Sequence, residues 1–236
     1  MNLEKRFTRG FSLLGNYTFS KTLDDNGPVS DPFDLRCGWG ISTNSLPHVF
    51  HLSVVWDAPR FKTGRVASAH VNGWELTGIN SWQSGFPFTV YSGVNNSFTA
   101  VGSDRADFIG SNYGGAILST SRSHSQMIQQ YFNTALLKTN AIGTFGDGPR
   151  NAWQNPGLSN TDLATLKNFK FSDKTTLQFR VEFFNSFNNV NFTVPGLGSA
   201  NPNASAAGAT VGTANFGKLT HAADPRILQF ALKLFL

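Results

Sequence analysis

The stretch Asp162–Phe187, DLATLKNFKFSDKTTLQFRVEFFNSF, predicts two strands joined by a tight turn. Leu163–Phe171 is the first predicted strand, Ser172–Lys174 the turn and Thr175–Phe187 the second strand. In the second strand apolar and polar side chains alternate, which indicates an extended strand between an apolar and a polar environment. A soluble sandwich would bury the apolar side chains in its core, whereas a membrane barrel would turn them to lipid and line its lumen with the polar ones. The apolar set is Leu177, Phe179, Val181 and Phe183, and the polar set is Gln178, Arg180 and Glu182.

The composition favours a membrane environment. Of the 236 residues only 14% are charged, and 22 are Phe, whereas about a quarter of a soluble domain is charged. No apolar run approaches the roughly 20 residues that a membrane-spanning helix needs. A chain that crosses a bilayer must then do so as a β-barrel, because only helices and closed barrels satisfy their backbone hydrogen bonds in lipid.

Charge, cysteine content and the first residues narrow the function classes. The net charge of +5 is small, and the sequence contains no basic cluster. We therefore expect a solvated surface and no nucleic-acid partner. The single Cys37 provides neither a disulfide framework nor a metal set. The first residues, MNLEKR, precede no apolar core of a secretion signal. The chain is therefore either cytoplasmic or the tail of a longer protein, and the strand pattern favours the tail.

Alternation predicts about seven strands in all. A Gly85-Phe86-Pro87 break suits a strand that leaves the sheet near its end, since Pro cannot donate to a ladder. Besides the two strands above, the predicted strands are Asn2–Phe7, Phe11–Ser20, His48–Asp57, Gly73–Tyr91 and Arg226–Leu236.

The connections alternate between short and long. Consecutive antiparallel strands place alternate connections at opposite ends of a sheet, so we expect all the long ones at one end. Short turns on one side and long loops on the other are typical of outer-membrane barrels. One short helix is expected, over Ser125–Lys138. The predicted long loops are Lys21–Pro47, Ser92–Asn160 and Asn188–Ala223.

Several segments, in this order and spacing, resemble the late barrel of TonB-dependent receptors of the Oar-like group. The most specific block is Phe179–Asn188, FRVEFFNSFN, followed by Asn191-Phe192. The last strand, apolar at every second position up to Leu236, resembles the targeting strand of bacterial outer-membrane proteins. The other matching segments are Gly73–Ile79, Gln83–Val90, Tyr131–Thr134, Gly143–Gly146, Pro149-Arg150-Asn151, Pro156-Gly157 and Asp162-Leu163.

The resemblance implies a location in the cell outer membrane and a plugged barrel of about 22 strands. With about seven antiparallel up-and-down strands, residues 1–236 are expected to be the carboxy-terminal part of such a transmembrane β-barrel, without the plug domain, and to form an open curved sheet. The implied partners are outer-membrane lipid, the remainder of the barrel and its plug, and an inner-membrane energy-transducing complex.

Five polar residues are the candidates for facing the lumen: Gln178, Arg180, Glu182, His51 and Asp57. His51 and Asp57 share a strand face but lie six residues apart, about 20 Å along an extended strand, so a catalytic pair is not expected. We expect no catalytic, cofactor-binding or metal-binding residues and no enzyme activity.

Residues near the predicted strand ends fit a membrane interface. Lys167 and Lys233 lie where their long side chains can snorkel. The aromatic residues there suit interfacial girdles, or alternatively a platform for stacking sugars. They are Trp56, Trp82, Phe86, Phe88, Phe169 and Phe171.

Three functions remain open. The leading hypothesis is a barrel segment of a receptor that takes up a ligand by TonB-dependent transport. The second is an outer-membrane structural or adhesion protein that uses the same barrel without transport. The third is a soluble carbohydrate-binding β-sandwich, which predicts that the apolar faces around Phe179 and Leu52 bury against one another.

Overall fold

In the computed structural model the described residues are 1–25, 31, 33–62, 64–99, 104–172, 174–192 and 208–236. Across these residues seven strands form one antiparallel sheet in the order β1-β2-β5-β6-β11-β12-β13, so each strand pairs with its neighbours along the chain. The all-β, up-and-down prediction is confirmed, and no pairing within the described part joins β1 to β13. The strands are β1 (Asn2–Thr8), β2 (Phe11–Phe19), β5 (His48–Asp57), β6 (Trp74–Gln83), β11 (Leu158–Lys170), β12 (Thr176–Phe184) and β13 (Ile227–Phe235).

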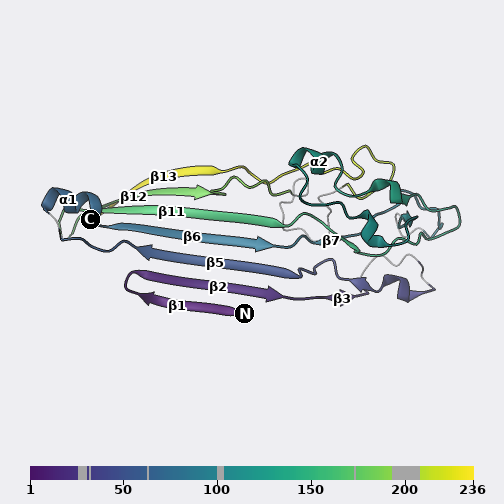
Figure 1. The fold of residues 1–236 in the computed structure, drawn as a ribbon, viewed down its shortest axis with the longest axis horizontal. Coiled ribbons are helices and arrows are strands. Elements are labelled where there is room, and N and C mark those ends of the chain that lie inside the picture. The colour runs from purple at the N-terminus through teal and green to yellow at the C-terminus, as the bar shows by residue number, and fades with distance from the viewer. Residues whose placement is uncertain (26–30, 32, 63, 100–103, 173, 193–207) are drawn as a thin grey trace.

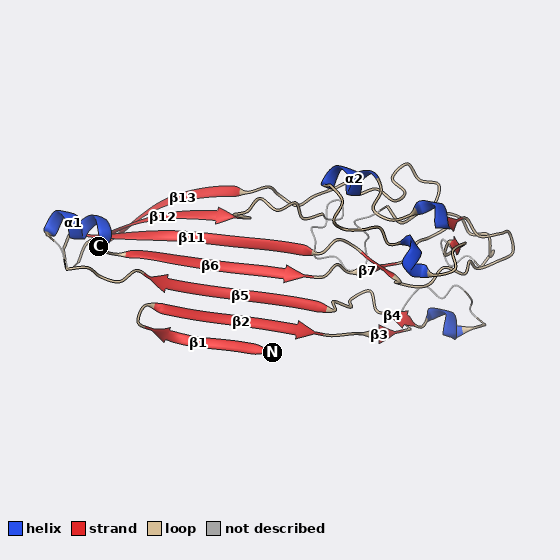
Figure 2. Cartoon of the chain, in the orientation of Figure 1, coloured by secondary structure: helices blue, strands red, loops and turns tan. Residues whose placement is uncertain are grey.

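Short elements lie in the connections (Figure 2). None of the helices in the described residues is both long and apolar enough to cross a membrane. The helices are η1 (Leu35–Gly38), α1 (Arg65–Val71), η2 (Tyr113–Ala116), α2 (His124–Gln129) and η3 (Thr134–Leu136). The small strands form three pairs: β3 (Leu23–Asp24) with β4 (Gly40–Ile41), β7 (Pro87–Phe88) with β10 (Trp153–Gln154), and β8 (Asp107–Phe108) with β9 (Leu137–Lys138).

The strand registers sort the side chains of the sheet into two faces. Phe50 pairs with Tyr17 on one side and Trp82 on the other, which sets apolar residues beside one another across three strands. Val181 likewise pairs with Phe230. We call this side the apolar face, and it contains Phe50, Leu52, Val54, Phe179, Val181 and Phe230. We call the other side the polar face, and it contains His51, Ser81, Asn160, Gln178, Arg180 and Glu182.

No second sheet covers the apolar face in the described residues. Phe230 is 65% exposed and Leu232 69% exposed. Phe179 and Leu52 lie on the same face of one sheet, because the register runs unbroken from β5 through β6 and β11 to β12. The soluble sandwich hypothesis is therefore wrong: it needs these two groups to face each other from opposite sheets.

Aromatic residues gather near both ends of the apolar face. Toward one end the Tyr17 hydroxyl bonds His48 Nδ1 at 2.8 Å, and the His48 ring lies 6.4 Å from that of Trp82. Trp56 and Trp74 lie toward the other end. Trp74 and Trp82 are about 27 Å apart along β6 at the usual rise of an extended strand. This spacing suits the apolar band of an outer-membrane barrel, which is about 25 Å tall and flanked by aromatic girdles.

Short and long connections separate to opposite ends of the sheet, as predicted (Figure 1). Residues 9–10, 58–73 and 171–175 make the short-turn end, at the left of the figure. Residues 20–47, 84–157 and 185–226 make the loop end at the right, and we call their described parts the cap.

The main hydrophobic core of the described residues lies in the cap and not in the sheet. Phe88 packs there with ring centroids 5.7 Å from Phe132 and 6.3 Å from Trp153. An apolar cluster of this kind gives the long connections a folded structure of their own. Its buried members are Phe88, Val90, Ala106, Phe108, Ala116, Phe132, Leu137, Trp153 and Leu219.

Some predicted boundaries are wrong. The strand predicted to reach Tyr91 ends at Gln83, and Phe88 is buried in the cap and so does not belong to a girdle. The strand predicted from Leu163 begins at Leu158, because Leu158–Asp162 pair with Ile79–Gln83. Asp173 of the predicted turn lies outside the described residues.

The helix predicted over Ser125–Lys138 is also wrong. Ser123 starts α2 with a capping box, but α2 ends at Gln129. The Asn133 side chain then accepts from the Ala135 N–H and begins the separate turn η3, and Leu137 already belongs to a strand. An Asn side chain that caps a new turn competes with continuation of a helix.

Candidate functional site

The polar face carries all five candidate residues, in two groups. Gln178, Arg180 and Glu182 lie on β12, whereas His51 and Asp57 lie on β5, with β6 and β11 between. A row of polar residues crosses four strands at the level of His51, whose Nδ1 lies 3.1 Å from Ser81 Oγ. The row is Asn16, His51, Ser81 and Asn160.

The charges on β12 are only partly paired. Arg180 Nη2 donates to Glu182 Oε1 at 2.5 Å along the same strand. The Arg180 Nε–H is buried and has no acceptor among the described residues. Gln178 Nε2 donates to Asn168 Oδ1 on β11 at 3.0 Å. Charged and amide side chains such as these suit a lumen that holds water or a plug. A charged side chain costs much less free energy there than on the lipid-facing side.

Asp57 faces a like charge. It pairs directly with Glu75 across β5 and β6, and opposed like charges destabilise a sheet. His51 does not form a catalytic pair with Asp57, because their separation of six residues remains in the regular strand β5. Among the described residues no cluster of three or more His, Cys, Asp or Glu is arranged to hold a metal ion.

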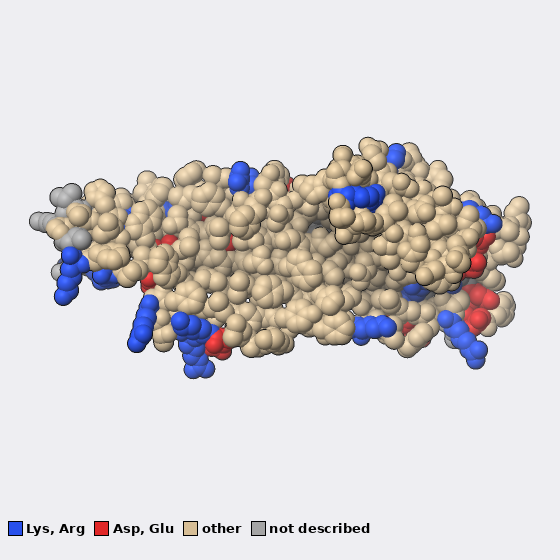
Figure 3. Space-filling model, in the orientation of Figure 1, with Lys and Arg blue, Asp and Glu red and all other residues tan. Residues whose placement is uncertain are grey.

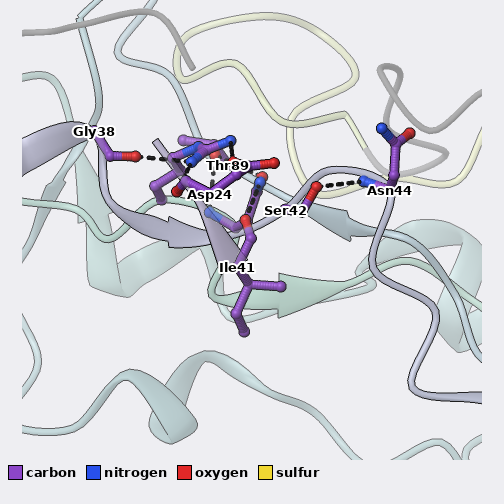
Figure 4. A network of polar contacts seen from close by, with 8 residues as sticks. Asp24, Gly38, Ile41, Ser42, Asn44 and Thr89 are labelled. Carbon is purple, nitrogen blue, oxygen red and sulfur yellow. Dashed lines mark hydrogen bonds and ion pairs between the residues drawn. The ribbon is translucent and has the colours of Figure 1, made fainter. Parts of the chain in front are cut away.

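Arg150 joins two loops of the cap. Its Nη2 donates to Asp24 Oδ1 at 2.6 Å, and its Nη1 donates to the backbone oxygens of Asp24 at 2.8 Å and Gly38 at 2.7 Å (Figure 4). The Arg150 side chain is only 6% exposed. A planar guanidinium suits this role, because its fixed donors reach several acceptors at once.

Asn151 extends the joint. Its Nδ2 donates to the Ile41 backbone oxygen at 2.7 Å, and its Oδ1 accepts from Thr89 Oγ1 at 3.0 Å. Its own N–H donates back to Thr89 Oγ1 at 2.9 Å (Figure 4). Through Arg150 and Asn151, the Pro149-Arg150-Asn151 segment thus holds the connections 20–47 and 84–157 together by hydrogen bonds and an ion pair.

A buried carboxylate organises another part of the cap. Asp104 accepts from Ser97 Oγ at 2.6 Å, from the Ser97 N–H at 2.8 Å and from Asn140 Nδ2 at 3.0 Å. Burial opposes its charge, but these hydrogen bonds together outweigh burial and lower the pKa of Asp104 below its ordinary value. The carboxylate therefore stays ionised, and it holds the segments around Ser97 and Asn140 together.

A pocket of about 720 Å³ lies where the cap meets the ends of β6 and β11. Its size is within the range of about 300–1,000 Å³ that is usual for ligand sites. The residues that line it include no Lys, Arg, Asp or Glu. Aromatic and amide side chains are prominent in the lining, among them Trp82, Gln83, Tyr131, Trp153, Gln154, Asn188 and Asn191.

Sequence reasoning missed both the pocket and the Arg150 joint. The pocket residues come from segments far apart in the chain, without any period that would link them. The available signal was the concentration of Asn and aromatic residues in the long connections, together with the Pro149-Arg150-Asn151 match.

Comparison with known proteins identifies the family of the chain over almost its full length. The family model described as an outer membrane beta barrel domain matches residues 1–229. Searches of the curated proteins and of the solved structures gave no match. The matched range covers the sheet almost entirely and all of the cap, and it agrees with the uncovered apolar face and the segregated loops. The chain therefore belongs to the outer membrane beta barrel domain family, and its place is the outer membrane.

Proposed function

We propose that the chain forms part of the barrel wall of a TonB-dependent receptor, which takes up a ligand through its lumen. In this proposal the apolar face contacts lipid, the polar face lines the lumen, and the cap lies outside the cell. The chain itself makes and breaks no bond. Its partners are the rest of the barrel, a plug and an inner-membrane complex that supplies energy.

One observation carries the proposal most: the long connections are folded into a cap with its own core, and a pocket lies where this cap meets the ends of β6 and β11. A barrel that served only as an anchor has no need of an ordered pocket at this place. The unpaired Arg180 Nε–H supports it further, because a plug in the lumen would supply the acceptor.

The pocket suggests what kind of ligand enters. A charged ligand would lose its hydration there, and apart from the imidazole of His124 the lining offers no basic or acidic side chain as a counter-charge, which is unfavourable. A wholly apolar ligand would leave the amide groups without partners. We therefore propose an uncharged polar ligand.

The test is energy-dependent uptake by cells that express the whole protein. Growth medium containing uncharged sugars and peptides is compared by mass spectrometry before and after incubation, with and without a protonophore. We expect one compound to be depleted only by expressing, energised cells. Gln154→Ala, on the pocket wall, should weaken that uptake, whereas Gln129→Ala, at the end of α2 and outside the lining, should not.

The alternative proposal is a surface or adhesion role without transport. It is favoured by large apolar side chains that protrude from the cap, among them Phe33, Phe98 and Ile142. Two results together would favour this role over uptake: no compound is depleted in the uptake test, and cells lose attachment when these residues are replaced by Ser.

A further inference from the structure

The connection 58–73 at the short-turn end holds an exposed aromatic ring between two cations. Phe61 is 55% exposed, and its neighbours Arg60 and Lys62 are exposed as well. The backbone there is fixed: the Phe61 N–H donates to Asn72 Oδ1 at 2.7 Å, and Asn72 Nδ2 donates to the Phe61 backbone oxygen at 2.9 Å. These hydrogen bonds hold the exposed Phe61 at a fixed place between the two cations.

Lys167 fastens the same connection to the apolar face of the sheet. Its Nζ donates to the backbone oxygen of His70 at 3.1 Å and to that of Asn72. It also lies 5.1 Å from the ring centroid of Trp74, whose Nε1 donates to the His70 oxygen at 2.9 Å. The connection 58–73 therefore lies beside Trp74, at the short-turn end of the apolar face.

The connections at the short-turn end carry several cations although the sequence shows no basic run, and the nearest carboxylates, Asp57 and Glu75, lie in the adjoining strands. The described residues of its three connections contain no Asp or Glu, and Asp173 lies outside them. In Figure 3 blue side chains lie at the left, with red ones among them, as well as at the right, and most of the surface over the strands is tan. The cations of these connections whose side chains the structure describes are Arg9, Arg60, Lys62 and Lys174.

We propose that Arg60-Phe61-Lys62 is a binding site for anionic phospholipid headgroups in the membrane leaflet at the short-turn end. Phe61 lies in the interface at the level of Trp74, and Arg60 and Lys62 pair with lipid phosphates. Aromatic rings prefer the membrane interface, and basic groups beside it attract anionic lipid. A periplasmic protein would be the other occupant, but continuity with the apolar face favours lipid.

This site does not depend on transport, because it would serve a receptor and an adhesion protein equally. Its test uses the whole protein in nanodiscs of phosphatidylcholine, with or without phosphatidylglycerol. Native mass spectrometry counts the bound phosphatidylglycerol. Arg60→Gln combined with Lys62→Gln should lower the affinity about fivefold per cation. The matched double control is Lys21→Gln with Lys138→Gln, both exposed in the cap, and it should leave the affinity unchanged.

The depth of residue 61 gives a second readout that does not depend on lipid counting. In a Cys37→Ser background, a spin label on Phe61→Cys should be more accessible to oxygen than to a water-soluble nickel complex. A label on Ile142→Cys, at a position 78% exposed in the cap, should show the reverse. Equal loss of phosphatidylglycerol in both double variants, or a label at 61 that contacts water as freely as the label at 142, would overturn the proposal.

Discussion

Arg150 shows how much a single side chain can contribute where loops meet. It is almost fully buried and serves one carboxylate and two backbone oxygens. Removal of the guanidinium takes away the donors to the partly buried Asp24 carboxylate and to the buried Gly38 oxygen, and a buried acceptor without its donor costs more than the hydrogen bond itself contributes.

Arg150→Gln should therefore loosen the connection 20–47 by about 3 kcal/mol. Hydrogen exchange is the measurement, with the Ser42 N–H as reporter, because it donates to Thr22 within that connection. Its exchange should accelerate about 100-fold, while the strands keep their protection. Arg36→Gln, which removes an exposed guanidinium from the same connection, should change little; an equal effect of both variants would contradict the assignment.

At this scale the sequence predicted part of the site. Gln178, Arg180 and Glu182 alternate with apolar residues on one strand, so their shared face follows from a period of two. The role of Arg150 has no such signal. Its acceptors, at Asp24 and Gly38, are more than 100 residues away in the chain, and contacts of that range leave no local pattern.

Among the elements, the strands form the predictable part of the fold. His48–Asp57 was predicted to the residue, because its alternation is regular and turn residues bound it. The predictions failed where apolar residues continue without belonging to the sheet. Phe88 continues the apolar pattern of β6, yet it lies in the core of the cap, and no period distinguishes the two environments.

The two faces of β5 give a direct test of sidedness. Leu52 lies on the apolar face and Ser53, the next residue, on the polar face. Leu52→Arg should destabilise the folded protein in lipid vesicles by about 2–4 kcal/mol, the cost of Arg on a lipid-facing strand near the middle of the bilayer. Ser53→Arg should cost less than about 1 kcal/mol. Urea unfolding followed by Trp fluorescence measures both, and a larger cost for Ser53→Arg would reverse the assignment of the faces.

For the whole molecule, the decisive property is the separation of the connections to opposite ends of the sheet. In outer-membrane barrels short turns face the periplasm and long loops the exterior. The order of connection lengths along the chain was enough to predict this separation. That the long connections would pack into a single cap was not predictable, because its core draws residues from two of them, Phe88 and Leu219 among others.

Labelling of intact cells tests this orientation. In a Cys37→Ser background, Ile142→Cys in the cap should react with a membrane-impermeant maleimide on living cells. Lys174→Cys, exposed in the 171–175 turn, should react only after the outer membrane is permeabilised. Labelling of both positions on intact cells, or of Lys174→Cys alone, would contradict the proposed orientation.

With the cap outside the cell, as proposed, its separate core also determines which antibodies bind this protein. Because Phe88, Phe132 and Trp153 pack among themselves, the outer surface of the cap is assembled from segments distant in the chain. Antibodies raised against linear peptides of the long connections should bind intact bacteria poorly, whereas antibodies raised against the folded protein should recognise epitopes that vanish on denaturation.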